Sequence, residues 1–406
     1  MRDALPVLPL ALPLLLALRI WGSLPADVRM RCREVCPAWR DALAEPRVWA
    51  TVDLTATSGV VARVTPALLR AVAARASGQL ERLFVTYGRE LQPALLAAVS
   101  ANRDTLRLLR LESGGRGHYS APAFETLLRT APRQCVVEAS MIASFTDAGP
   151  MLRNEAPFWG LRLGWLQVTG GGDMLATDVA SLASALAAHP SLRELGLRYI
   201  PLSTFAALDE VVDAAVALRL TKLELFGCSV GAASAVALPR LLHDGDALLE
   251  FSLSGGQVLD AHAAQLLAGA LRSNRTLTSL TLYSVELWRN MDAATTLFGA
   301  LIGHASLTSI KLQHNDARHV AAAAGALLSA LVLAESPLCV LDISANLLGD
   351  DGLLPLLSAL PRSTHLEELW CINETVTNSC VRATVAWASE QLALHRLGSL
   401  RTLQFE

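Results

Sequence analysis

The chain has 406 residues, of which 52% are hydrophobic and 17% charged, and this balance excludes an intrinsically disordered protein. Its 34 lysines and arginines against 37 aspartates and glutamates give a net charge of −3. No general electrostatic attraction to nucleic acid or to an anionic membrane is therefore expected. Seven cysteines without paired CxxC motifs argue against a zinc site and favour a reducing, intracellular compartment.

An apolar lead-in, residues 1–11, opens the chain and belongs to a longer apolar run at 4–18. This run permits a signal peptide, with a poor cleavage site at 24–26. It is too short for a transmembrane helix, and prolines interrupt it, so no membrane association is expected. Sequons at Asn274 and Asn373 are compatible with secretion. A secreted or lumenal protein with its leader removed is therefore the alternative to an intracellular one.

Residues 12–54 are predicted to form a compact helical module. The proline of Leu12-Pro13 suits the first turn of a helix, where its missing N–H is not needed. Leu24-Pro25 ends that helix, and Asp27 can cap the next one. The apolar residues between 28 and 39 then recur at helical spacing. A module of about forty residues is not easily stable alone, so it is expected to dock on something else.

The order of Leu-Pro, Leu-Pro, Val-Cys-x-x-Trp-Arg and a closing Trp in this module resembles an F-box. The resemblance implies that the module binds the Skp-family adaptor of a cullin-RING ubiquitin ligase. The adaptor-binding positions that it implies are Leu12, Pro13, Ile20, Leu24, Pro25, Val35, Cys36, Trp39, Leu43 and Trp49. Leu14 stands where the family usually has an acidic residue, and Pro37 where it commonly has arginine. A helical hairpin that caps the following repeats is the alternative.

A linker and capping helix are predicted over 55–79, and a repeat array over 80–406. The pattern L-x-x-L-x-L recurs in twelve copies, one of them degenerate, which begin 26 to 34 residues apart with a mean of about 29. The copies begin at Leu80, Leu106, Gln134, Leu163, Leu192, Leu220, Leu248, Leu277, Leu307, Leu338, Leu366 and Leu400. Each copy predicts a short strand whose leucines face a core.

Between these copies, apolar residues recur at helical spacing, for example over 263–271 and 320–331. One strand–helix unit cannot bury both of its apolar faces, so neighbouring units must stack. The units resemble leucine-rich repeats of the ribonuclease-inhibitor type, most closely at 346–354. We therefore expect an α/β horseshoe solenoid with parallel inner strands and outer helices, preceded by the small all-α module.

Several residues that look chemically active fit this scaffold. Asn315, Asn346 and Cys228 each stand eight positions after the first residue of a repeat. Leucine-rich repeats carry Asn or Cys at that position, and its side chain bonds to backbone across neighbouring turns. His314 and His319 lack a third metal ligand, and the sequence has no serine-hydrolase, zinc-protease or paired-carboxylate motif. We therefore expect no catalytic residue, metal or cofactor.

In an L-x-x-L-x-L strand, the third, fifth and seventh positions point away from the core, onto the concave face. This face mixes both charge signs and carries aromatic residues, which favours a protein-binding surface. The candidate target-binding residues on it are Arg198, Lys222, Glu224, Phe226, Tyr283, Lys311, Gln313, Glu368 and Trp370.

The sequence thus predicts a non-catalytic substrate receptor of the cytoplasm or nucleus. Its F-box-like module docks on the adaptor, and its concave face holds a target protein that the sequence does not identify. A repeat-type activator of a small GTPase is a further alternative, but no arginine or asparagine stands out on a loop edge as its catalytic group.

Overall fold

The structure, a computed structural model, describes residues 43–55, 64–87, 89–113, 126–127, 129–132, 134–140, 160–164, 183, 186, 192–198, 202–228, 230–255, 260–372, 382, 385–386, 388–390 and 399–404. The chain divides into two compact units. The N-terminal unit comprises Met1–Leu166 with Ala188–Leu192, and the C-terminal unit comprises Gln167–Ala187 with Arg193–Glu406. Within the described ranges, no helix is long and apolar enough to cross a membrane.

The N-terminal unit is built on a parallel sheet whose strands pair in chain order. Its strands are β1 (Thr51–Leu54), β2 (Arg82–Tyr87), β3 (Leu108–Ser113), β4 (Val136–Ser140) and β5 (Gly160–Gly164). Its described helices are α4 (Pro66–Ala76) and α5 (Gln92–Ala101), with the 3-10 turns η1 (Pro46–Trp49) and η3 (Arg89–Leu91).

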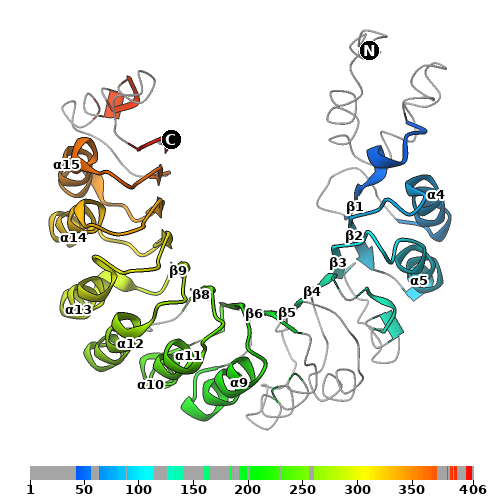
Figure 1. The fold of residues 1–406 in the computed structure, drawn as a ribbon, viewed down its shortest axis with the longest axis horizontal. Coiled ribbons are helices and arrows are strands. Elements are labelled where there is room, and N and C mark those ends of the chain that lie inside the picture. The colour runs from blue at the N-terminus through cyan, green and yellow to red at the C-terminus, as the bar shows by residue number, and fades with distance from the viewer. Residues whose placement is uncertain are drawn as a thin grey trace. The chain divides into compact units, whose positions relative to one another are not determined.

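The C-terminal unit repeats this plan, again with parallel strands in chain order. Its strands are β6 (Glu194–Arg198), β7 (Lys222–Phe226), β8 (Glu250–Ser254), β9 (Ser279–Tyr283), β10 (Ser309–Lys311), β11 (Val340–Asp342), β12 (Glu368–Trp370) and β13 (Thr402–Gln404). The helices and 3-10 turns are α9 (Phe205–Ala217), α10 (Ala232–Ala235), α11 (Leu238–Asp244), α12 (Ala261–Ser273), η4 (Leu287–Arg289), α13 (Met291–Leu301), α14 (Ala321–Leu333), α15 (Gly349–Ala359) and η5 (Leu360–Arg362). Within this unit the strands line the inner side of an arc and the helices its outer side (Figure 1).

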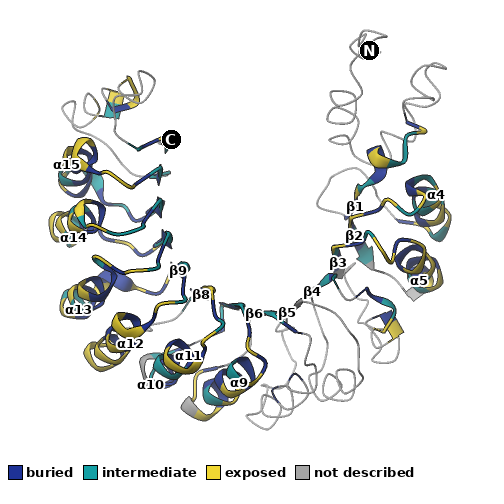
Figure 2. Ribbon diagram, viewed as in Figure 1, coloured by how far each residue is buried: buried dark blue, intermediate teal, exposed yellow. Residues whose placement is uncertain are grey.

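The core of the C-terminal unit lies between the strands and the helices. In β7, Leu223 and Leu225 are 0% and 1% exposed, whereas Phe226 on the opposite face is 39% exposed. In α12, Leu267 and Leu271 are buried against the strands, while exposed residues lie on the outer side of the helices (Figure 2). The predicted α/β leucine-rich-repeat fold, with parallel inner strands and outer helices, is therefore confirmed.

Short polar residues set where several helices begin. Thr204, Asp260 and Asn290 precede α9, α12 and α13, and each side chain accepts a hydrogen bond from the backbone N–H three residues further on. Such N-caps satisfy one of the amide groups that the first helical turn leaves without a partner. The chain can therefore turn from strand to helix within a few residues.

The repeats begin earlier than Leu80. Strand β1 pairs in parallel with β2, and Trp49, Val52 and Leu54 are each 0% exposed. These three residues match the repeat pattern, with Trp49 in the place of its first leucine. Helix α4 follows β1 as the helix of this additional repeat, in the segment where a linker and a capping helix were expected.

One predicted strand is placed differently. The sequence pattern Leu163-x-x-Leu166-x-Val168 predicts a strand after Leu163, but β5 spans Gly160–Gly164. In β5, Leu161 lies opposite Val137 of β4, and Leu163 lies opposite Ala139. Two overlapping apolar patterns occur here, and pairing with β4 selects the earlier one. The prediction for this copy was therefore wrong in register, which a sequence pattern of period two cannot fix by itself.

Candidate protein-binding face

The concave face of the C-terminal unit is the side of its strands that points away from the core. Every predicted target-binding residue lies on it or at its edge, and none is in the core. Two of them are exposed, Arg198 and Phe226. The others are half-buried, namely Lys222, Glu224, Tyr283, Lys311, Gln313, Glu368 and Trp370. Their placement is confirmed, whereas their contact with a target protein stays a prediction.

Phe226, Tyr283 and His314 form an aromatic row along the carboxyl ends of the strands. The ring centroids of Phe226 and Tyr283 are 6.2 Å apart with an interplanar angle of 37°. Those of Tyr283 and His314 are 4.8 Å apart with an angle of 43°. At one end of the row, the guanidinium carbon of Arg198 lies 5.8 Å from the centroid of the Phe226 ring, within the range of a cation–π interaction.

The row crosses a strand that contributes no ring of its own. In the sheet register, Phe226 lies beside Ser254 of β8, and Ser254 lies beside Tyr283 of β9. Ser254 is 4% exposed and its side chain is short. Because neighbouring strands lie about 4.8 Å apart, the two rings approach each other across two strand spacings only when the residue between them is small.

A charged cluster occupies the amino-terminal side of the same face. The ammonium group of Lys222 lies 3.1 Å from a carboxylate oxygen of Glu224 and 2.9 Å from one of Glu250. Burial by itself would lower the pKa of Lys222, but the two carboxylates raise it above its usual value. Lys222 is therefore held charged, and its charge is compensated within the protein.

Two further contacts fix polar side chains towards the C-terminal end of the face. Gln313 donates from Nε2 to Oδ2 of Asp342 at 2.5 Å, and Trp370 donates from Nε1 to Glu368 at 3.2 Å. Lys311 lies beside Asp342 in the register, yet in the described part of the chain it forms no ion pair with it. Positive charge at Lys311 is therefore available at this surface.

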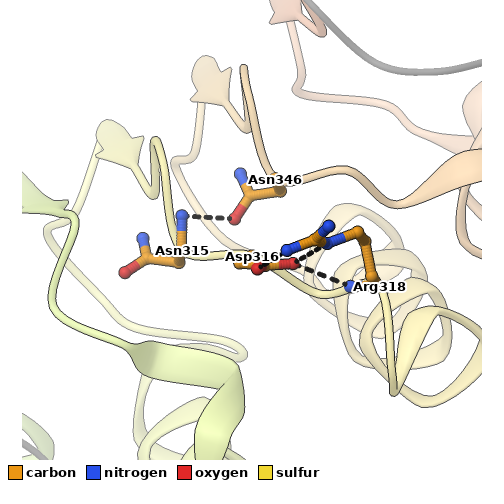
Figure 3. Close-up of polar contacts among 4 residues, drawn as sticks. All are labelled: Asn315, Asp316, Arg318 and Asn346. Carbon is orange, nitrogen blue, oxygen red and sulfur yellow. Dashed lines mark hydrogen bonds and ion pairs between the residues drawn. The ribbon is translucent and has the colours of Figure 1, made fainter.

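Beneath the ends of the strands lies a ladder of buried polar side chains. Asn346 donates to the carbonyl of Leu312 at 2.6 Å. It also accepts from the backbone N–H of Asn315 at 3.3 Å (Figure 3). Asn315 donates in turn to the carbonyl of Leu282, and Cys228 to that of Leu197. Each bond spans one repeat, so the predicted structural role of Asn315, Asn346 and Cys228 is confirmed.

The turn next to this ladder carries an exposed ion pair. Arg318 binds both carboxylate oxygens of Asp316, at 2.9 and 2.7 Å (Figure 3). The hydrogen bonds from Arg318 lower the pKa of Asp316. The charges of both residues are thus neutralised next to His314.

The N-terminal unit carries a second set of side chains on the face of its strands that points away from the core. The guanidinium of Arg110 lies 5.0 Å from the ring centroid of Phe84 and 2.5 Å from a carboxylate oxygen of Glu138. These three residues are direct neighbours across β2, β3 and β4. Sequence reasoning did not select them, although they stand at the same outward positions of the repeat as the predicted residues.

The adaptor-binding prediction is corrected at two residues. Trp49 and Leu43 are each 0% exposed, and Nε1 of Trp49 donates to the carbonyl of Leu43 at 2.9 Å. The guanidinium carbon of Arg75 in α4 lies 5.8 Å from the Trp49 ring centroid. These side chains are part of the core at the start of the repeats and do not present a surface to an adaptor. The other implied adaptor contacts lie outside the described residues: Leu12, Pro13, Ile20, Leu24, Pro25, Val35, Cys36 and Trp39.

The sequon at Asn274 is also explained by the fold. Asn274 is 6% exposed, and its Nδ2 donates to the carbonyl of Leu242 at 2.6 Å. Its Oδ1 accepts from the backbone N–H groups of Thr276 and Leu277. Because the side chain is buried and its amide is held by these bonds, Nδ2 is not accessible for glycosylation in the folded protein, and this sequon gives no support to secretion. The second sequon, at Asn373, lies outside the described residues.

His314 is the member of the aromatic row that sequence reasoning did not select. It directly follows Gln313, the last outward position of its repeat, and its backbone φ is +57°. This left-handed conformation, uncommon for residues other than glycine, turns the imidazole back towards Tyr283. The signal in the sequence was its repeat position, the eighth, which Gly227 and Gly255 occupy with positive φ in two earlier repeats.

Comparisons with known proteins give neighbours in structure but none in sequence. No family model matches the chain, and no curated protein matches it. The leucine-rich repeat-containing protein LegL7 from Legionella pneumophila is similar with a TM-score of 0.45 and 16% identity, over 70% of this chain and 88% of that one. A chain of the yeast Rad7 and Elc1 complex has a TM-score of 0.44 and 14% identity, over 86% of this chain and 93% of that one. The fold assignment itself rests on the repeated strands and helices described above.

Proposed function

We propose that this chain is a non-catalytic receptor that holds a target protein on the concave face of its C-terminal unit. The observation that carries the proposal is the aromatic row, in which Phe226 remains 39% exposed at the end of β7 while its ring lies against that of Tyr283. Exposed aromatic side chains that are fixed by their neighbours bury a large area on binding and lose little conformational entropy. This is the property expected of an interface anchor.

The second part of the proposal concerns the segment ahead of the repeats. Residues 12–54 carry the F-box-like pattern, and we propose that the part of this segment ahead of Leu43 binds a Skp-family adaptor and, through it, a cullin-RING ubiquitin ligase. The chain would then act in the cytoplasm or nucleus, where the ligase works. Its contribution to the reaction is proximity, because a target held next to the ligase meets ubiquitin in an effectively intramolecular step.

The adaptor part is tested with the full chain and a purified Skp-family adaptor in size-exclusion chromatography. We expect the wild type to co-elute with the adaptor and Trp39→Ala to lose co-elution. Loss of an apolar aromatic contact should weaken the binding free energy by about 3 kcal/mol. Phe226→Ala, on the concave face, is the control and should co-elute like the wild type. A wild type that fails to bind the adaptor, or a Trp39→Ala variant that still binds it, would contradict this part.

The receptor part is tested by proximity labelling in cells, with a biotin ligase fused to the chain. We expect a set of labelled proteins that is lost in the Phe226→Ala/Tyr283→Ala variant but kept in Trp39→Ala. Labelling that is identical in all three proteins would show that the concave face holds no target.

A further inference from the structure

We infer that the aromatic row binds a short segment of the target in which a bulky apolar side chain stands next to an acidic one. This inference rests on the proposed receptor function and names the chemistry of the segment that the receptor recognises. It follows from the shape of the row and from the charges that surround it.

The apolar part of the inference comes from the spacing of the rings. Phe226 and Tyr283 stand on either side of the short Ser254 side chain, with 6.2 Å between their centroids. His314 extends the ring surface beyond Tyr283. Because Ser254 is 4% exposed and the two rings lie within contact range of each other, a target side chain lies across both rings, and a Phe, Leu, Ile or Trp side chain gains most from this position.

The acidic part comes from the carboxylates near the row, most of which contact a cation, while Asp342 accepts from the neutral amide of Gln313. Both Glu224 and Glu250 contact the ammonium group of Lys222. On the other side, Asp316 is bound by Arg318, and Glu286 is bound by Arg289 at 2.6 Å. Asp316 and Glu286 are each paired with an arginine, whereas Lys222 balances only one of the two charges of Glu224 and Glu250, so one negative charge is left at the amino-terminal side of the face.

The cations next to the row are not compensated in this way. The side chain of Arg198 lies over the face of Phe226, and Lys311 stands diagonally across the sheet from Tyr283. Within the described ranges, neither residue forms an ion pair with a carboxylate. The rings therefore lie between two positive charges, which an acidic residue beside the apolar anchor complements.

A single-stranded nucleic acid is the other ligand that stacks on aromatic side chains. The row fits it less well, because among the described residues two uncompensated cations lie near the rings, while nucleic-acid sites follow a chain of phosphates with a continuous basic groove. The net charge of −3 points the same way. An oligonucleotide is therefore included in the test as the competing outcome.

The experiment is a selection from a phage-displayed library of random 12-residue peptides on the immobilised full-length chain. We expect enriched peptides in which Phe, Leu, Ile or Trp is adjacent to Asp or Glu. A synthetic peptide of the enriched sequence should bind about 30-fold more weakly to Phe226→Ala/Tyr283→Ala, which corresponds to a loss of about 2 kcal/mol at an anchor position. Charge reversal in Arg198→Glu/Lys311→Glu should replace the acidic preference by a basic one, with circular dichroism confirming that both variants are folded.

The inference is overturned if no peptide is enriched above the level seen with Phe226→Ala/Tyr283→Ala, or if the wild type enriches basic peptides. It is also overturned if a fluorescent 12-nucleotide oligo-dT binds the wild type more tightly than the selected peptide. The peptide selection does not involve the adaptor, so its result is independent of the Trp39→Ala test. Target proteins that depend on Phe226 in cells, together with no peptide enrichment, would leave the receptor function standing and reject only the linear segment.

Discussion

Asn274 and His304 make the same backbone hydrogen bonds in successive repeats. Each stands three residues before the first leucine of a repeat, and each contacts a backbone carbonyl of the preceding repeat, at 2.6 Å from Asn274 and 2.9 Å from His304. Each also accepts hydrogen bonds from the backbone N–H groups two and three residues further on. An imidazole can fill this role only when it is neutral, with its proton on Nε2.

This equivalence predicts a pH dependence of stability. Burial lowers the pKa of His304; the hydrogen bond to the Leu271 carbonyl opposes this shift, and the charge of Arg275 adds to it. The unfolded chain takes up a proton at about pH 6.5, whereas the folded chain does so only at lower pH. The contribution of His304 to the free energy of unfolding is therefore complete above pH 6.5 and decreases as the pH falls towards the pKa of the folded state.

The measurement is urea unfolding of the wild type and of His304→Asn at pH 7.5 and 5.5. We expect the free energy of unfolding of the wild type to fall more on acidification than that of His304→Asn, because asparagine keeps the type of bonding seen at Asn274 and does not titrate. Equal pH dependence of the two proteins would show that His304 is not the group responsible.

The packing of α14 against α15 predicts a second effect on stability. A Cβ atom on Gly325 would lie 2.3 Å from the carbonyl oxygen of Gly352 and 2.7 Å from its Cα. Gly325→Ala must therefore move two helix backbones apart, and we expect a loss of about 1–3 kcal/mol in the free energy of unfolding. Thermal and urea unfolding both measure this change.

The chain offers a matched control for this variant in Gly269, which lies inside α12. A Cβ atom there meets nothing within 4 Å. Gly269→Ala should stabilise the protein by about 0.5–1 kcal/mol, because alanine restricts the unfolded chain and favours the helix. Shifts of the same sign in both variants would contradict the assignment of a close backbone contact to Gly325.

The repeat pattern predicted most of the strands because leucines on one side of a strand must all face the same core. It failed at β5, where two apolar patterns overlap and only pairing with β4 distinguishes them. It also missed the repeat that begins at Trp49, since a tryptophan in place of the first leucine fitted the F-box-like pattern as well. Both errors arise because the same apolar residues fit two sequence patterns, and the sequence alone does not say which pattern the fold uses.

The candidate face was predictable only in part. Alternation along the strands placed Phe226 and Tyr283 on the concave side, as the structure shows. Their contact depends on the small residue between them in the register, which no single repeat reveals. His314 depends on the left-handed backbone that recurs at the eighth position of the repeat, where Gly227, Gly255, Ser284 and Ala345 also have positive φ, and only comparison of several repeats reveals this.

The buried ladder gives a prediction about Asn346. Replacing it by alanine leaves the Leu312 carbonyl and the backbone N–H of Asn315 without these partners, and Nε1 of Trp288 loses the acceptor that now lies 2.9 Å away. Buried polar groups without partners are costly, so Asn346→Ala should lower the free energy of unfolding by about 3 kcal/mol. Urea unfolding checks the loss. Arg318→Ala in the adjacent exposed turn should unfold like the wild type, and an equally large effect there would mean that the ladder has no special role.

Trp49 provides the sharpest test of where the repeats begin. Its indole is fully buried, donates to the carbonyl of Leu43 and lies beneath the guanidinium of Arg75. Trp49→Ala should therefore destabilise the N-terminal unit by about 3–5 kcal/mol. Trp49→Phe keeps most of the apolar volume and loses one hydrogen bond, so we expect a smaller loss of about 1–2 kcal/mol.

Because the indole has no surface for an adaptor, the folded Trp49→Phe variant should co-elute with the adaptor like the wild type. A Trp49→Phe protein of unchanged stability that no longer binds the adaptor would return Trp49 to the adaptor interface.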